Sequence, residues 1–190
     1  MIIPNHAPQK KRLTIIGLGN EMLSDDGLGI RVVRELKNRL DDRSVAFEEL
    51  SVGGLQLFDY LIGTEECIIV DAIKTGTQPA GTLLRFVQTP DTEPVKITSS
   101  HQIDLGQILG LARFMGAPLP KRLTVYGIEA DDITTFSEQC TGEVARSIGR
   151  LVDLICRDLM DNESGCDNRT VLATESMPRD RIASWETINH

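Results

Sequence analysis

Stretches rich in apolar residues alternate along the chain with stretches in which apolar residues recur every three or four positions. The first kind predicts strands, most of them buried on both faces because their apolar runs are continuous. These predicted strands cover residues 13–18, 45–52, 67–70, 82–87 and 123–128. Each strand ends near glycine, proline or a polar residue, which is typical of a chain that turns at the end of a strand.

The second kind of stretch predicts amphipathic helices, each with one apolar face for a core. These predicted helices cover residues 28–40, 55–62, 105–112 and 144–159. Thr141 stands where the N-cap of the last helix is expected. Strands that alternate with helices indicate an α/β fold, here a single-domain three-layer sandwich whose mostly parallel, twisted sheet carries helices on both faces.

The length of 190 residues suits one domain with a substantial core. The two ends lack the periodicity of the middle and are polar. We therefore expect a flexible N-terminal arm at residues 1–11, the folded domain at residues 12–160 and a flexible polar tail at residues 161–190.

The formal net charge of −8 argues against a nucleic-acid partner, which requires clustered Lys and Arg. Four cysteines, Cys67, Cys140, Cys156 and Cys166, show no close pairing, so neither a disulfide framework nor a zinc knuckle is expected. The pattern also contains no signal peptide and no membrane span. These features together predict a reduced, cytoplasmic protein.

In a parallel α/β sheet, functional groups gather at the carboxyl ends of the strands. The sequence between Gly17 and Asp26 follows the first predicted strand and begins like a dinucleotide-binding GxGxxG motif. Met22 replaces the third glycine, and the two acids Asp25 and Asp26 would repel a pyrophosphate. A nucleotide cofactor is therefore not expected, although a nucleotide-binding regulator remains an alternative.

One of Asp25 and Asp26 is expected to cap the helix that follows them, and since a cap needs only one carboxylate, the other is free for a ligand. Asp71 by itself is compatible with a solvated turn residue, and His101 by itself with a capped or solvated histidine. Taken together, two carboxylates and an imidazole at the ends of neighbouring elements suit a divalent cation such as nickel or zinc.

These residues resemble a known family, the hydrogenase maturation endopeptidases. The resemblance covers residues 13–160 and rests on three segments: Gly17-x-Gly19-Asn20 with Asp25-Asp26-Gly27-x-Gly29, then Asp71-Ala72, then His101-Gln102. Members of this family remove a C-terminal extension from the large-subunit precursor of nickel–iron hydrogenases after nickel has been inserted. The resemblance implies a parallel-sheet α/β fold and a monomeric enzyme whose partner is that precursor.

The resemblance also implies a metal-contacting trio, here Asp26, Asp71 and His101, and the nickel would be supplied by the substrate. Gly19, Asn20 and Asp25 match positions that shape the turn around this trio. Gly53 and Gly54 match a glycine-rich loop that contacts the substrate.

The sequence contains no assignable Ser or Cys triad and no HExxH helix. Activation of water by a carboxylate or by a metal-bound carboxylate pair is therefore the expected chemistry, with Asp26 preferred over Asp71 as the base. The alternative is a non-catalytic nickel-binding accessory protein for hydrogenase assembly, which would use the same trio.

Overall fold

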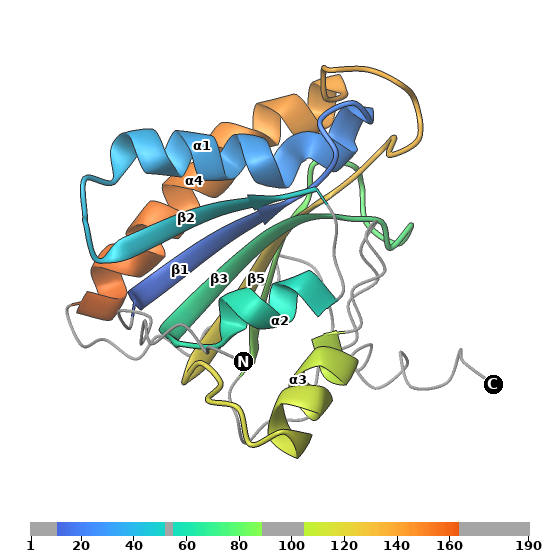
Figure 1. Ribbon diagram of the computed structural model, residues 1–190. Helices are drawn as coiled ribbons and strands as arrows, with labels where there is room; N and C mark the ends of the chain where they lie inside the picture. The colour runs from blue at the N-terminus through green and yellow to red at the C-terminus, as the bar shows by residue number, and fades with distance from the viewer. Residues whose placement is uncertain (1–10, 52–54, 89–104, 164–190) are drawn as a thin grey trace, which may run out of the picture.

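The computed structural model describes residues 11–51, 55–88 and 105–163. A five-stranded sheet with the strand order β2-β1-β3-β5-β4 forms the centre of this part of the chain (Figure 1). Its strands are β1 (Lys11–Leu18), β2 (Val45–Leu50), β3 (Thr64–Ile73), β4 (Leu83–Gln88) and β5 (Arg122–Glu129). β1 pairs in parallel with β2 and β3, and β3 pairs in parallel with β5. β4 alone among them runs antiparallel, at the edge beside β5, so the mostly parallel sheet is confirmed.

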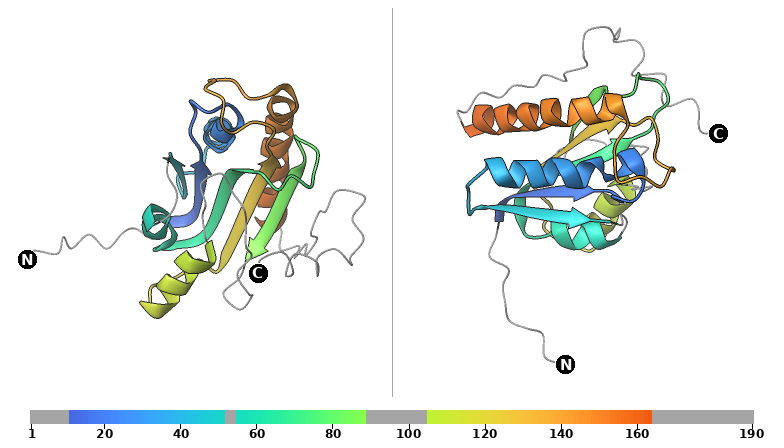
Figure 2. Two further views of the ribbon diagram at one scale, coloured as in Figure 1. Left: turned by 90° about the vertical axis from the view of Figure 1, so that its right-hand side faces the viewer. Right: turned by 90° about the horizontal axis from the view of Figure 1, so that it is seen from above.

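The helices form the outer two layers of the sandwich. They are the 3₁₀ helix η1 (Ser24–Gly27) and the α-helices α1 (Leu28–Arg39), α2 (Leu55–Leu61), α3 (Leu105–Phe114) and α4 (Gly142–Glu163). α1 and α4 pack side by side on one face of the sheet, and α2 and α3 cover the other face (Figures 1 and 2). The predicted three-layer α/β architecture is therefore confirmed.

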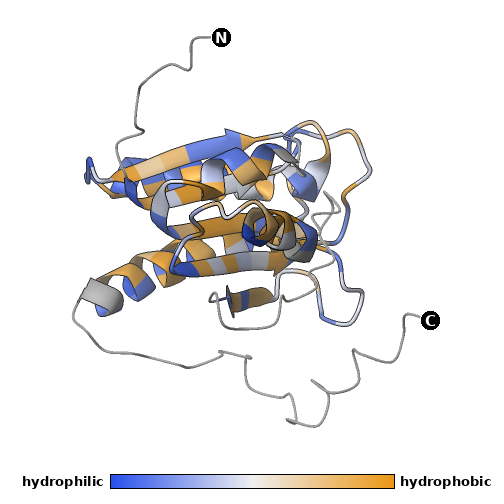
Figure 3. Cartoon of the chain, turned by 60° about the horizontal axis from the view of Figure 1, so that its bottom comes forward, coloured by the Kyte–Doolittle hydropathy of each residue, from blue (hydrophilic) through white to orange (hydrophobic). Residues whose placement is uncertain are grey.

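Two apolar clusters lie on the two faces of the sheet because successive strand residues point to opposite sides. Ile15 belongs to the cluster beneath α1 and α4, while its neighbour Ile16 belongs to the cluster beneath α2 and α3. The strands are accordingly apolar along most of their length, and α4 carries apolar and polar residues in alternating stripes (Figure 3). None of the described helices is both long and apolar enough to cross a membrane.

Among the predicted boundaries that differ from the structure, three concern Asp71 and the two ends of the domain. β3 continues through Ile73 rather than stopping at Asp71, because its ladder with β5 runs on to the pair Ile73–Glu129. Lys11 belongs to β1 rather than to the N-terminal arm, and α4 extends to Glu163, past the predicted end of the domain at residue 160. The rest of the arm and of the tail lies outside the described residues.

Two glycines allow α1 to pack directly on the sheet. A Cβ atom on Gly29, in the first turn of α1, would lie 2.2 Å from the carbonyl oxygen of Leu18 and 2.4 Å from that of Val70. A Cβ atom on Gly17 would in turn lie 2.4 Å from the carbonyl oxygen of Gly29. This approach of backbone to backbone fixes the start of α1, and hence η1, against the ends of β1 and β3.

Candidate functional site

The turn that follows β1 folds back on itself around Asp26. A Cβ atom on Gly19 would lie 2.2 Å from the Asp26 carbonyl oxygen, so only glycine fits there, with a φ of 153°. The backbone N–H of Asn20 donates to Oδ2 of Asp26 at 2.8 Å. The Asn20 side chain accepts a hydrogen bond from the N–H of Met22 at 3.1 Å. Gly19 and Asn20 thus lie within the turn, in contact with the residue predicted to reach the metal.

Asp26 lies in η1 and is 3% exposed. The helix α1 begins after Gly27, which makes no side-chain cap, so the prediction that one of the two aspartates caps this helix is wrong. The reason is geometric: the 3₁₀ turn lies between them and α1, the Asp26 carboxylate turns back towards Asn20, and the Asp25 carboxylate points to a distant loop.

Asp25 is fully buried and joins η1 to the segment between β5 and α4. Its Oδ2 accepts hydrogen bonds from the N–H groups of Asp131 and Asp132, both at 2.9 Å. Thr141 donates twice, through its N–H to Oδ1 at 2.6 Å and through its hydroxyl to Oδ2 at 3.0 Å. The Asp25 N–H also donates to the carbonyl of Asp132 at 2.9 Å. One carboxylate therefore ties the site turn to the start of α4.

Ser24, beside Asp25, has a positive φ of 46°, an uncommon conformation for a residue with a side chain. Its N–H donates to the carbonyl of Ser137 at 2.8 Å, and its hydroxyl donates to the carbonyl of Gln139 at 3.2 Å. The N–H of Ser137 donates in return to the carbonyl of Met22 at 3.0 Å, which completes a parallel bridge between Leu23 and Ser137. Tertiary contacts thus hold this strained residue in place.

Asp71 lies near the carboxyl end of β3, is 2% exposed and stands opposite Gly127 in the ladder with β5. The preceding residue, Val70, pairs with Gly17 of β1 and also meets Gly29 of α1. η1 contacts β3 as well. Asp26 and Asp71 therefore occupy the same edge of the sheet, where β1 and β3 end, and both are buried.

The other predicted site residues, Gly53, Gly54 and His101, lie outside the described residues. Within the described part of the chain, no group of three or more His, Cys, Asp or Glu side chains is arranged to hold a metal ion. The trio of Asp26, Asp71 and His101 therefore stays a prediction, of which the structure describes the two carboxylates.

A further buried carboxylate was not anticipated from the sequence. Glu129, at the end of β5, is 2% exposed and accepts hydrogen bonds from the N–H groups of Thr75 and Gly76, at 2.8 and 2.7 Å, and from the Thr75 hydroxyl at 2.8 Å. It holds the loop between β3 and β4. The sequence could have indicated Glu129 by its position directly after an apolar run, as it indicated Asp71.

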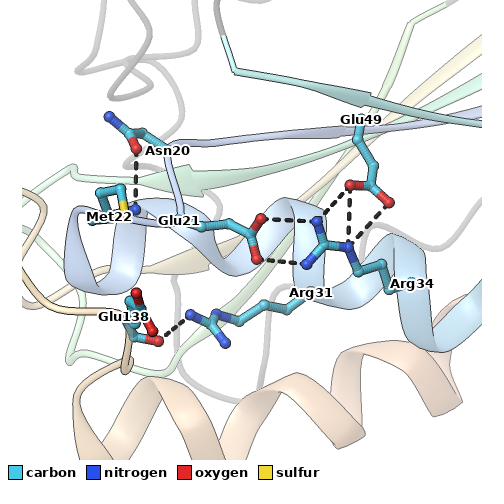
Figure 4. Close-up of polar contacts among 7 residues, drawn as sticks. All are labelled: Asn20, Glu21, Met22, Arg31, Arg34, Glu49 and Glu138. Carbon is cyan, nitrogen blue, oxygen red and sulfur yellow. Dashed lines mark hydrogen bonds and ion pairs between the residues drawn. The ribbon is translucent and has the colours of Figure 1, made fainter.

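An exposed cluster of charged residues joins the turn to α1 and β2 (Figure 4). Arg34 of α1 forms two hydrogen bonds with Glu21, at 2.6 and 2.8 Å, and further bonds with Glu49 of β2 at 2.8 to 3.1 Å. These hydrogen bonds raise the pKa of Arg34 above its ordinary value, and those with Glu49 have the largest effect. Because about half of the Arg34 side chain is exposed, water and salt screen this cluster, and it contributes less than the buried bonds of Asp25.

Comparison with known proteins identifies the family. The family model described as HycI, hydrogenase maturation protease, matches residues 30–158. The chain belongs to the hydrogenase maturation protease family. The match includes Asp71 and begins just after the turn that carries Asp26.

Individual members of the hydrogenase maturation protease family agree with this assignment over most of the chain. The Hydrogenase 2 maturation protease of Escherichia coli is 34% identical over 121 residues, 62% of this chain and 72% of that protein. The hydrogenase expression/formation protein HupD of Bradyrhizobium diazoefficiens is 29% identical over 155 residues, 80% of each chain. The solved structure of the hydrogenase maturating endopeptidase HybD from E. coli superposes with a TM-score of 0.67 at 26% identity, over 80% of this chain and 93% of that one.

Proposed function

We propose that this chain is an endopeptidase that removes the C-terminal extension of a nickel–iron hydrogenase large-subunit precursor after nickel has been inserted. The observation that carries the proposal is the pair of buried carboxylates, Asp26 and Asp71, at one edge of the sheet in a chain of this family. Relatives whose names contain the words maturation protease and maturating endopeptidase support the reaction class. The enzyme acts as a monomer in the cytoplasm.

Nickel is part of the substrate in this proposal. Charged groups buried as deeply as Asp26 and Asp71 require hydrogen bonds, ion pairs or a metal to offset the loss of water. Their oxygen atoms, with the imidazole of His101, make a donor set that suits a divalent transition metal. The three side chains recognise nickel already bound in the precursor, so that a precursor without nickel is not cleaved. Such discrimination is a difference in affinity between two states of one substrate.

A carboxylate activates the water that attacks the peptide bond. Asp26 is the preferred base, because it lies in the short helix η1 of the turn after β1 rather than within the ladder of a strand. Asp71 lies within the ladder of β3 and β5, which restricts its movement and suits it to holding the metal. The proposed chemistry therefore needs no Ser or Cys nucleophile.

The test mixes the purified protein with nickel-loaded and with nickel-free large-subunit precursor, and follows peptide release and the cleavage position by mass spectrometry. Cleavage of the loaded precursor alone is expected. Equal cleavage of both would refute nickel recognition. Binding of the loaded precursor without peptide release would make the chain an accessory protein rather than a protease.

Variants test the site within the same assay. Asp26→Asn, Asp71→Asn and His101→Ala should each lose cleavage while the far-ultraviolet circular dichroism stays that of the native fold. Asp59→Asn, which changes an exposed aspartate of α2, is the matched control and should keep full activity. Full activity in all three site variants would show that the trio is wrongly assigned.

A further inference from the structure

Two exposed apolar side chains lie beside the turn that carries Asp26. Phe136, between β5 and α4, is 77% exposed, and Met22, between Asn20 and Asp26, is 46% exposed. We refer to these two residues as the Met22–Phe136 patch. Single exposed apolar residues are ordinary, but two that are brought together from distant parts of a chain, next to a candidate site, call for a physical explanation.

The parallel bridge between Leu23 and Ser137 brings the two segments that carry these residues together. Met22 and Phe136 are the residues that precede the bridge partners on the two segments. The Met22 carbonyl accepts a hydrogen bond from the N–H that directly follows Phe136, so the two exposed residues lie next to each other along the bridged segments. The hydrogen bonds from Ser137 N–H to the Met22 carbonyl and from Ser24 N–H to the Ser137 carbonyl fix this register.

The segment that carries Phe136 is held firmly at both ends. On one side Asp132 Oδ1 accepts hydrogen bonds from the N–H groups of Thr134 and Thr135, at 2.9 and 3.0 Å, and the buried Asp25 accepts from Asp132 itself. On the other side the carbonyl of Gln139 accepts from Ser24. These bonds hold the loop in a conformation that exposes Phe136. Little further conformational entropy of the loop is then lost when a ligand binds.

We propose that the Met22–Phe136 patch binds an apolar side chain of the polypeptide substrate close to the cleaved bond. This inference rests on the proposed function. The argument for the occupant is continuity with the site: the N–H of Met22 is bonded to the Asn20 side chain, and the N–H of Asn20 is bonded to the carboxylate of Asp26. An extended chain advances only about 3.3 Å per residue. A peptide bond at Asp26 therefore brings a residue a few positions away onto the patch.

The chemistry of the two side chains suits this occupant. A methionine adapts its shape to an incoming group, and an aromatic ring supplies a large rigid apolar surface at low entropic cost. The acid next to Met22 in the chain, Glu21, is bonded to Arg34. The two apolar side chains therefore suit an apolar substrate side chain.

The test compares cleavage of nickel-loaded precursor by the full-length protein and its variants. Phe136→Ala and Met22→Ala should each raise KM and lower kcat/KM about tenfold while kcat stays within about twofold, because binding is lost and the chemistry is not. Phe136→Leu keeps an apolar side chain and should restore most of kcat/KM. Phe114→Ala is the matched control: that ring, at the end of α3, is 90% exposed and lies outside the site turn and the loop that contacts it, so no change is expected.

The outcomes separate this inference from the proposed function. If the unmodified protein cleaves the precursor and Phe136→Ala cleaves it with unchanged kcat/KM, the docking inference fails and the protease assignment stands. If the unmodified protein cleaves nothing, the proposed function fails first. Sedimentation that shows a dimer in the unmodified protein and a monomer in Phe136→Ala would make the patch an interface between two copies, which also overturns the inference.

Discussion

Replacing Asp25 by alanine is the most direct test of how the site is held together. The change deletes a fully buried carboxylate that accepts four hydrogen bonds from the segment between β5 and α4. Three come from backbone N–H groups, of Asp131, Asp132 and Thr141, and one comes from the Thr141 hydroxyl. All of these donors lose their partner at once.

The magnitude follows from the number of donors and from their access to water. A hydrogen bond to a charged group contributes about 1.5–3 kcal/mol, so four would give roughly 6–12 kcal/mol if every donor stayed dry. Asp131 is exposed, and Asp132 and Thr141 are half-buried, so water can reach several of these donors after a small movement of the loop. We therefore expect Asp25→Ala to lower the free energy of unfolding by about 3–5 kcal/mol, the range seen when one partner of a buried charged group is removed.

The assay is equilibrium unfolding in urea, followed by circular dichroism, with a thermal melt as a second measurement. A loss of that size corresponds to a fall in melting temperature of roughly 6–20 °C for a chain of this length. Asp25→Asn retains one oxygen as an acceptor but places an amide NH₂ against a donor. Its loss of unfolding free energy should therefore lie between zero and that of Asp25→Ala. Hydrogen exchange of the Thr141 amide should accelerate in both variants.

The matched control is Asp132→Ala in the same loop. Its carboxylate accepts hydrogen bonds from Thr135 and Thr134, and these, with Thr135 having the largest effect, lower the pKa of Asp132 below its ordinary value. Because those donors are exposed or near the surface, water replaces the carboxylate, and the loss of stability should be much smaller. Equal losses in Asp25→Ala and Asp132→Ala would refute the reasoning that burial makes Asp25 the anchor.

Three further predictions concern the core. Gly29→Ala places a Cβ atom 2.2 Å from a strand carbonyl and should lower the free energy of unfolding in urea by more than about 3 kcal/mol, whereas Gly149→Ala, in open space on α4, should raise it slightly. Burial, aided by the hydrogen bond to Asp158, raises the pKa of Tyr126 above 10.0. The folded protein therefore keeps this proton longer, and its unfolding free energy should fall above pH 10 by up to about 1.4 kcal/mol per pH unit, a fall that Tyr126→Phe removes in urea titrations at each pH. Burial also raises the pKa of the Cys67 thiol, so peptide mapping after iodoacetamide treatment should show Cys67 alkylated only when urea is present.

Local pattern was sufficient to predict the strands, the helices and the sandwich. A continuous apolar run such as residues 67–70 encodes a strand buried on both faces, whatever its neighbours are. The glycines that follow β1 signalled a tight turn, and the structure shows what they permit: Gly19 lies against the Asp26 backbone, and Gly29 lies against β1 and β3. The placing of Asp26 and Asp71 at one sheet edge also followed from sequence order, because parallel strands end at a common edge.

The errors arose where the partner of a residue lies far away in the chain. Asp25 was expected to serve its own turn or the next helix, yet its four donors are more than 100 positions away. Asp71 was expected to end a strand, but pairing with β5 extends β3 beyond it. Neither fact is encoded within a few residues of the aspartate concerned.

The sequence by itself therefore determined the alternation of strands and helices, the glycine turn and the position of Asp26 and Asp71 after β1 and near the end of β3. Periodicity and turn chemistry are local, and each acts on its own segment whatever the remainder of the chain does. Only the tertiary structure decided that Asp25 is an anchor and that the segments of Met22 and Phe136 are bridged. Both depend on hydrogen bonds, with donor and acceptor about 3 Å apart, between segments that are far apart in the chain. Such segments meet only after the sheet and helices have packed, and packing is a property of the whole fold.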